Sequence, residues 1–393
     1  MNIRYLLLIL CFFTFNSITS QAKLSVYSEV SILTVGPGED LHVAFGHSAI
    51  RVKDPVLNLD LVYNYGVFDF DAPNFLLNFA NGNMIYSLAR YDFKYFLASY
   101  KNEKRWVKQQ TLNLNQQEKQ AYFLFLENNA LPKNKNYQYD PYFNNCATKL
   151  RDITTSILKE KVVFFDNNKV TNISFRKLTN NELLPNSWSS FGLNLIAGTK
   201  LDKKTTLDEQ LFLPDYVYKS FKEARLFRKN QPEELVKKET ILLNFEENKA
   251  EIILFNPLFC FTLFLLFTIY ITYQNLKKKK RSTWFDFILF FIPGLIGSIL
   301  LYLWLFSSHS TAPNNFNVFW AFPINLIVAF LMLKKEVSKW IKMYILFLIV
   351  LLLVLMLIWI QEIQMFSFVI IPLLISLLIR YTYLKGNLLT FFK

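Results

Sequence analysis

The sequence predicts a two-part chain: an exported α+β domain followed by an all-α transmembrane bundle. The N-terminus has the pattern of a secretory signal peptide. Residues 23–250 have a mixed composition and are numerous enough to bury a sizeable core. From residue 252 onward Leu, Ile, Phe and Val dominate. We therefore divide the chain into a signal peptide (1–22), an exported domain (23–250) and a membrane domain (251–393).

The signal peptide also decides how many thiols the exported domain keeps. Arg4 precedes an apolar run that is too short to span a bilayer, and the small residues at Ser20 and Ala22 fit cleavage after Ala22. Cys11 leaves with this segment, and Cys260 lies in an apolar membrane segment. Cys146 is then the one thiol of the exported domain, where an unpaired Cys is either reactive or deeply buried.

The membrane domain contains about five candidate transmembrane helices, and the last is the shortest. A helix needs about 20 apolar residues to cross the hydrocarbon core. The candidates are residues 252–273, 284–305, 317–333, 341–360 and 365–379.

Charge asymmetry predicts the orientation. Twelve Lys and Arg residues and one acid, Glu336, lie between the first two spans, between the third and fourth, and after the last. The connections 306–316 and 361–364 hold no Lys or Arg. Because basic loops stay cytoplasmic, the exported domain is expected on the periplasmic side of a bacterial inner membrane. These loops carry most of the net charge of +13, so that charge is no evidence for nucleic-acid binding.

Hydrophobic periodicity gives a coarse order of elements for the exported domain. We expect strands at 24–33, 41–52 and 61–68, helices over the sheet at 71–100, a strand at 104–114 and a helix at 115–129. A helix at 147–160 follows, then a polar segment at 167–186 that is looped or helical. Residues 189–202, with two glycines, could close against a site; a helix at 213–225 and a strand at 240–245 end the domain.

Cys146 stands where a polar, turn-forming run meets a segment with helical apolar spacing. Asn144 or Asn145 is a suitable N-cap. A helix N-terminus favours the thiolate, but each unit of pKa lowering needs about 1.4 kcal/mol, so a base is also required. The simpler alternative is a small buried Cys.

His47 is the candidate base. It lies in the strand expected at 41–52, and a polar group on the next strand would orient it: Asn64, or alternatively Asp69. A Cys at a helix start facing a His on a strand is the papain-like arrangement, and His before Cys is the order of its circularly permuted, NlpC/P60-type branch. The alternative for His47 is an ordinary core histidine.

Segments 45–52, 63–70, 144–152 and 308–317 resemble the Lnb-type lipoprotein N-acyltransferases, over nearly the whole mature chain. The resemblance implies a cysteine acyltransferase that moves a fatty acyl group from a membrane phospholipid, through a thioester on Cys146, to the N-terminal amine of exported lipoproteins. It implies His47 as base, and backbone N–H groups at the helix start would hold the oxyanion.

Two other interpretations remain open at this stage: a cysteine peptidase or amidase acting on cell-wall peptides, and a non-enzymatic membrane sensor. His309, in the outer loop between the second and third spans, is a candidate for positioning lipid head groups, against the simpler alternative of an exposed polar loop residue. The three histidines and the exported Cys have no metal-ligand spacing, and we expect no cofactor.

Overall fold

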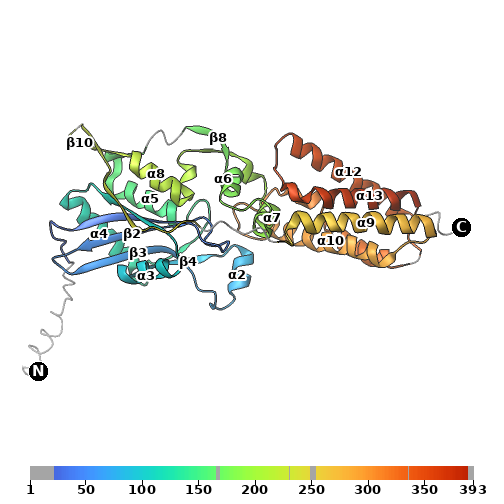
Figure 1. Ribbon diagram of the computed structural model, residues 1–393, viewed down its shortest axis with the longest axis horizontal. Helices are drawn as coiled ribbons and strands as arrows, with labels where there is room; N and C mark the ends of the chain where they lie inside the picture. The colour runs from blue at the N-terminus through green and yellow to red at the C-terminus, as the bar shows by residue number, and fades with distance from the viewer. Residues whose placement is uncertain (1–21, 165–168, 230, 248–253, 335, 388–393) are drawn as a thin grey trace, which may run out of the picture.

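The computed structural model describes residues 22–164, 169–229, 231–247, 254–334 and 336–387. Figure 1 shows a mixed domain built around a sheet and, beside it, a bundle of long helices. The predicted fold class, an α+β domain followed by a helical region, is confirmed. Residues 1–21 of the expected signal peptide, with Cys11, and the expected boundary at residue 250 lie outside the described residues.

A seven-stranded antiparallel sheet is the centre of the exported domain, with strand order β12-β5-β1-β2-β3-β4-β6 among the described residues. The strands are β1 (Glu29–Val35), β2 (His47–Asp54), β3 (Leu59–Val67), β4 (Ile85–Asp92), β5 (Val107–Leu112), β6 (Asn136–Gln138) and β12 (Val236–Leu243).

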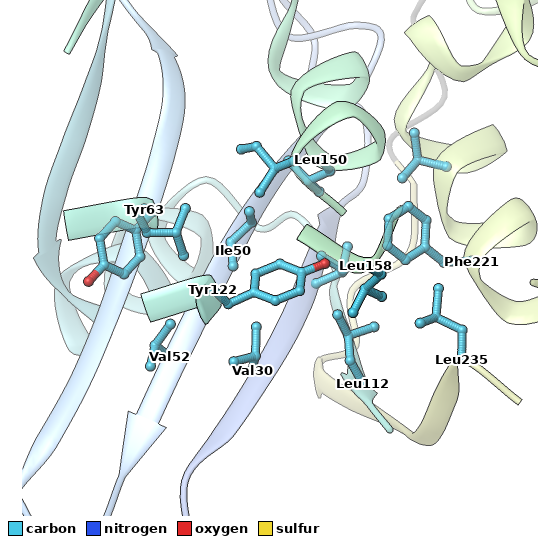
Figure 2. Packing of buried hydrophobic residues seen from close by; sticks show 14 of the residues in the cluster. Val30, Ile50, Val52, Tyr63, Leu112, Tyr122, Leu150, Leu158, Phe221 and Leu235 are labelled. Carbon is cyan, nitrogen blue, oxygen red and sulfur yellow. The ribbon is translucent and has the colours of Figure 1, made fainter. Parts of the chain in front are cut away.

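Helices cover both faces of this sheet. On one face, α4 (Gln116–Ala130) and α5 (Cys146–Leu158) pack against strand residues such as Ile50 and Tyr63 (Figure 2). On the other face lies α3 (Phe93–Asn102). Because successive side chains of a strand point to opposite faces, the neighbour Ala49 joins the α3 cluster while Ile50 joins the α5 cluster.

The expectation of helices throughout 71–100 was wrong in its middle part. The segment forms a short helix, α2 (Phe75–Asn81), then strand β4, then α3. Tyr86 and Leu88 are buried while the residues between and before them are not, which is a period of two rather than 3.6. The second strand likewise begins later than expected, at His47, because residues 41–45 form a turn.

Residues 159–164 and 169–228 form a part of the domain that is built from short helices and short strands. Its elements are η1 (Lys159–Lys161), β7 (Val162–Val163), β8 (Val170–Ser174), α6 (Phe175–Asn181), α7 (Trp188–Ile196), η2 (Thr199–Asp202), β9 (Lys204–Thr206), η3 (Glu209–Phe212), α8 (Pro214–Glu223) and β10 (Arg225–Arg228), with β11 (Gln231–Glu234) beside it. Buried Arg176 ties three of them together, since it pairs with Asp202 and donates to Asn194 and to the Ala197 carbonyl.

Four helices in the described residues are long and apolar enough to cross a membrane: α9 (Pro257–Lys278), α10 (Thr283–Leu305), α12 (Trp340–Ile360) and the segment Phe368–Asn387, which contains η5 (Phe368–Ile370) and α13 (Ile371–Asn387). The last helix begins and ends later than the expected 365–379. The expected span at 317–333 is instead broken into η4 (Phe316–Phe319) and α11 (Asn325–Met332), with Pro323 between them.

The broken segment still runs from one end of the bundle to the other. At its start Asn315 donates to the Leu195 carbonyl of the exported domain, and just after its end the Lys334 carbonyl accepts from Arg281 at the opposite end. A Cβ on Gly294 or Gly297 of α10 would lie 2.1 or 1.6 Å from this backbone. Small residues on α10 therefore allow close contact with the segment.

Arg380 lies inside the bundle and not, as its place in the sequence indicated, in a tail after the last span. Its buried guanidinium pairs with Asp286 of α10 at 2.7 Å and donates to Thr272 and Asn275 of α9. The arrangement satisfies a buried charge and joins three helices.

The two connections without basic residues both contact the exported domain. The Gly198 N–H donates to the Thr311 carbonyl at 2.8 Å, and Gln364 donates to the Ala197 carbonyl at 3.2 Å. A Cβ at Gly198 would lie 1.9 Å from the Pro313 oxygen. We expected residues 189–202 to close against a site. In the structure they form the surface that the outer loop contacts. Both connections lie on the side of the exported domain, as the charge pattern predicts.

Candidate active site

Cys146 is the first residue of α5, and the start of this helix is fixed by Asn145. The Asn145 Oδ1 atom accepts the N–H groups of Ala147 and Thr148, each at 2.9 Å, and the Thr148 hydroxyl accepts the Asn145 N–H. The Asn145 Nδ2 atom donates to the carbonyls of Pro141 and Phe212. Of the two candidate caps, Asn145 is therefore the one that holds the helix start.

The loop before the helix is connected to the membrane domain. Asp140 Oδ1 accepts the N–H groups of Tyr142 and Phe143, and its Oδ2 accepts the Ser310 hydroxyl of the outer loop at 2.5 Å. The position of Cys146 is thus coupled, through this Asx-type turn, to the loop between α10 and the third membrane segment.

His47 is the first residue of β2, and a tight turn places it there. Gly46 before it has φ +76°, and a Cβ at that position would lie 2.8 Å from the Val35 carbonyl oxygen. Only glycine adopts this backbone without strain so close to a neighbouring strand. The turn lets the chain enter β2 with the imidazole at the very end of the strand.

Strands β2 and β3 separate at this end. Their pairing runs from Asp54/Leu59 to Ile50/Tyr63, and the β3–β4 register is bulged between Asn64 and Val67. Gly66, at φ +90°, lies in the bulge, and a Cβ on it would be 3.7 Å from the Cβ of Cys146. Cys146 approaches the sheet at this split, where strand pairing no longer occupies the backbone.

The structure brings Cys146, His47 and Asn64 together in one row. The His47 Nε2 atom lies 2.6 Å from Asn64 Oδ1, and Cys146 and the His47 side chain lie close enough for each to shift the pKa of the other. With Nε2 bound to Asn64, Nδ1 is the ring nitrogen left for the sulfur. Asn64 is in turn held by its Nδ2 donating to the Tyr91 hydroxyl at 3.1 Å.

The electrostatics of the pair favour its charged form. Burial raises the pKa of the Cys146 thiol, but the facing imidazolium, its hydrogen bond, and the N–H groups of Ser48 and Ala147 outweigh burial and lower that pKa below its ordinary value. Burial lowers the pKa of His47, yet the Cys146 thiolate and the bonds to Cys146 and Asn64 raise it overall. Both shifts favour thiolate and imidazolium together.

His309 and Asp69 lie elsewhere. The His309 Nε2 atom donates to the Phe79 carbonyl at 2.8 Å, and its ring meets the Phe79 ring edge-on. His309 therefore holds the outer loop to α2, which is neither of the alternatives that we expected; its predicted role with lipid head groups stays a prediction. Asp69 accepts the Asp71 N–H at 2.9 Å and is exposed, while Asn64 occupies the orienting position.

Sequence reasoning missed the Tyr91 hydroxyl, the Ser48 N–H group and the Gly66 bulge. The one available signal was a glycine inside a predicted strand, which often marks a bulge. The expected oxyanion donors are also fewer, since the cap takes the Ala147 and Thr148 N–H groups and leaves the N–H of Cys146 itself. In the described part of the chain, no three His, Cys, Asp or Glu side chains are grouped to hold a metal ion.

Comparison with known families assigns both parts of the chain. Residues 14–178 match the family model of the Lnb N-terminal periplasmic domain, and residues 247–388 match that of the Lnb transmembrane domain. No curated protein and no solved structure matches the chain. The two family matches follow each other in the order of the two parts seen in the structure, and the chain therefore belongs to the Lnb family, with a periplasmic segment and a membrane domain.

Proposed function

We propose that the chain is a cysteine-dependent acyltransferase of the bacterial inner membrane, with a permuted papain-like site. It would move a fatty acyl group from a membrane phospholipid to the N-terminal amine of exported lipoproteins. The observation that carries the proposal is the Cys146–His47–Asn64 row, held in a domain whose nucleophile loop is bonded to the membrane domain.

The first half-reaction forms a thioester. The Cys146 thiolate attacks the ester carbonyl of the phospholipid, a C–S bond forms, and the N–H of Cys146 donates to the oxyanion. The tetrahedral adduct collapses with cleavage of the C–O bond, and the His47 imidazolium gives its proton to the leaving lysophospholipid alkoxide.

The second half-reaction transfers the acyl group. The α-amine of the lipoprotein attacks the thioester carbonyl, a C–N bond forms and the C–S bond breaks. His47 accepts the proton that the amine loses, and Cys146 returns as thiolate. Asn64 keeps the imidazole in one orientation and one tautomer through both steps, because its Oδ1 atom accepts the Nε2 proton.

Membrane anchoring separates this proposal from its alternatives. Both substrates are lipid-anchored, so a site tied to the outer loop meets them at the bilayer surface. A cell-wall amidase gains nothing from the bonds that Asp140 and Gly198 make with that loop. A sensor with a merely buried Cys146 does not need the aligned His47 and Asn64. We therefore favour the acyltransferase.

The test is to trap the acyl group on Cys146. The full chain, reconstituted with phospholipid and no acceptor, is expected to gain the mass of one acyl chain, released by hydroxylamine. Cys146→Ala abolishes loading, whereas Cys260→Ala, the matched control in the membrane domain, keeps it. Mass spectrometry of lipoprotein N-termini then shows N-acylation lost only with Cys146→Ala. Unacylated protein with intact peptide-cleaving activity would support the amidase instead.

A further inference from the structure

Helix α2 exposes a patch of large apolar side chains. Leu76 is 80% exposed, Leu77 58% and Phe70 63%, and Phe79 is also exposed. We call Phe70, Leu76, Leu77 and Phe79 the α2 patch. Residues 72–89 contain no Lys, Arg, Asp or Glu. A contiguous apolar surface of this kind marks a site of interaction.

Helix α2 lies beside the C-terminal end of α10, one of the four long apolar helices. The Ser308 N–H donates to the Asn81 carbonyl at 2.7 Å, and the Tyr302 hydroxyl of α10 bonds the Asn81 side chain. At Gly82 a Cβ would lie 2.6 Å from the His309 nitrogen, so α2 and the outer loop touch directly. Figure 1 shows α2 at the end of the exported domain that faces the membrane helices.

The end of α10, which is bonded to α2, also exposes large apolar side chains. Leu305 is the last residue of α10 and Phe306 follows it; both are exposed, and Tyr302 stacks on Phe306. Aromatic side chains at the end of a spanning helix mark the interface between lipid and water. An apolar helix bonded to that end lies within reach of the same lipid.

We propose that the α2 patch is immersed in the outer leaflet, with phospholipid acyl chains as its partner. The partner is recognised by apolar contact and not by charge, since the patch has no basic residue and Asp69 and Asp71 stand beside it. Anionic head groups therefore add nothing to the attraction.

The position of the patch also deepens the proposed function, on which this step rests. A continuous row of aromatic rings, with centroids 4.2 to 6.2 Å apart, leads from α2 into the domain: Phe79, Phe75, Phe68, Tyr86 and Tyr139. The last ring lies beside Gly66, and a Cβ on Gly66 would be 3.7 Å both from this ring and from the Cβ of Cys146. Apolar side chains thus connect the immersed helix to the thiol, and an acyl chain that follows them remains in contact with apolar surface as its ester approaches the sulfur.

Photo-crosslinking in the full chain tests the immersion without reference to activity. Benzoylphenylalanine replaces Leu76 in one variant and Tyr95 of α3, which is 62% exposed, in the other. Both chains are reconstituted in phosphatidylcholine vesicles and irradiated. We expect lipid adducts at least fivefold more abundant at position 76 than at 95, unchanged when phosphatidylglycerol is added. Equal yields, or adducts to a second copy of the chain or to another protein, would overturn the proposal.

Acyl loading tests the link to Cys146. Leu76→Asp combined with Leu77→Asp is expected to lower loading from vesicles about tenfold while iodoacetamide still reacts with Cys146 at the rate of the parent chain. Val56→Asp, in the β2–β3 turn at an exposure between those of Leu76 and Leu77, is the control and keeps loading. If the parent chain never loads, the proposed acyl transfer is wrong, and the crosslinks still show whether the α2 patch is immersed in lipid. If the double variant loads at the parent rate, the proposed link between the α2 patch and Cys146 is wrong.

Discussion

The charge on Cys146 is set by a balance between burial and its neighbours. Burial alone would keep the thiol neutral, and the His47 imidazolium with the N–H groups of Ser48 and Ala147 reverses that preference. The pKa of His47 depends on the same two effects with opposite signs: burial lowers it, and the Cys146 thiolate raises it. The ion pair is therefore populated from the lowered pKa of Cys146 up to the raised pKa of His47.

Alkylation of Cys146 should report this balance directly. In a Cys260→Ala chain the iodoacetamide rate is expected to rise with pH at a midpoint below 9.0, the ordinary value for the thiol. In His47→Gln the burial remains but the cation is gone, so the midpoint moves to higher pH than in the parent chain. Rates measured by mass spectrometry between pH 5 and 10 give both midpoints, and identical midpoints would contradict the pairing.

Asn64 is expected to matter less than the base that it orients. Asn64→Ala frees the imidazole to rotate and should lower the rate of acyl loading about ten- to a hundredfold, against the ~10²–10⁴-fold that a general base contributes. Tyr91→Phe, which removes only the support of Asn64, should cost less than Asn64→Ala. An Asn64→Ala chain that loads at the parent rate would assign the orienting role elsewhere.

Residue type and context were enough to find the three central side chains. A lone exported thiol at a helix start and a histidine on a strand are rare enough to stand out. Asn64 then follows as the amide on the next strand that could orient the histidine. Tyr91 and the Ser48 N–H could not be found in this way. One depends on the register between β3 and β4, and the other is a backbone group that every residue carries.

Among the elements, the split between β2 and β3 makes the site possible. Beyond Ile50 and Tyr63 the ladder ends, so the Ser48 N–H is free to reach the sulfur, and Asn64 can face His47 across the gap. The bulge with Gly66 opens the space on the β3 side. A sequence pattern gives the presence of both strands, but not the point at which they part.

Two glycines within residues 189–202, the surface that the outer loop contacts, form a matched pair for testing this contact. Gly198→Ala drives a Cβ into the Pro313 carbonyl oxygen and is expected to destabilise the chain by ~1–3 kcal/mol and to slow acyl loading. Gly192→Ala, inside α7 with no atom within 4 Å of the new Cβ, should instead stabilise by ~0.5–1 kcal/mol. Thermal unfolding in detergent measures both. A tolerated Gly198→Ala would mean that the loop can move away.

At the scale of the whole molecule, the exported domain and the bundle are joined by hydrogen bonds from two separate connections. Gly198 meets the first and Ala197 the second, so the domain is held at the bilayer surface by more than its covalent link. A site that uses two membrane-anchored substrates gains from being held there, because the substrates then need to diffuse only within the plane of the membrane to reach it.

Cysteine labelling tests the predicted topology, including the short third segment. In a chain without native thiols, Lys280→Cys and Glu336→Cys are expected to react only after the cytoplasmic side is opened. Gln361→Cys should react in intact spheroplasts. All three positions are exposed. If position 336 is labelled from outside, the segment containing α11 does not cross the membrane.

The sequence by itself determined the two-part architecture and the periplasmic side of the exported domain, and it pointed to the three side chains that the structure brings together, because composition, charge asymmetry and residue type are local properties. Only the tertiary structure decided that α2 and residues 189–202 contact the outer loop, and that β4 interrupts a segment that composition made look helical. The tertiary structure also decided that Arg380 turns into the bundle. These outcomes depend on which surfaces meet across long sequence separations, and the free energy of such contacts cannot be assigned to any one segment of the chain.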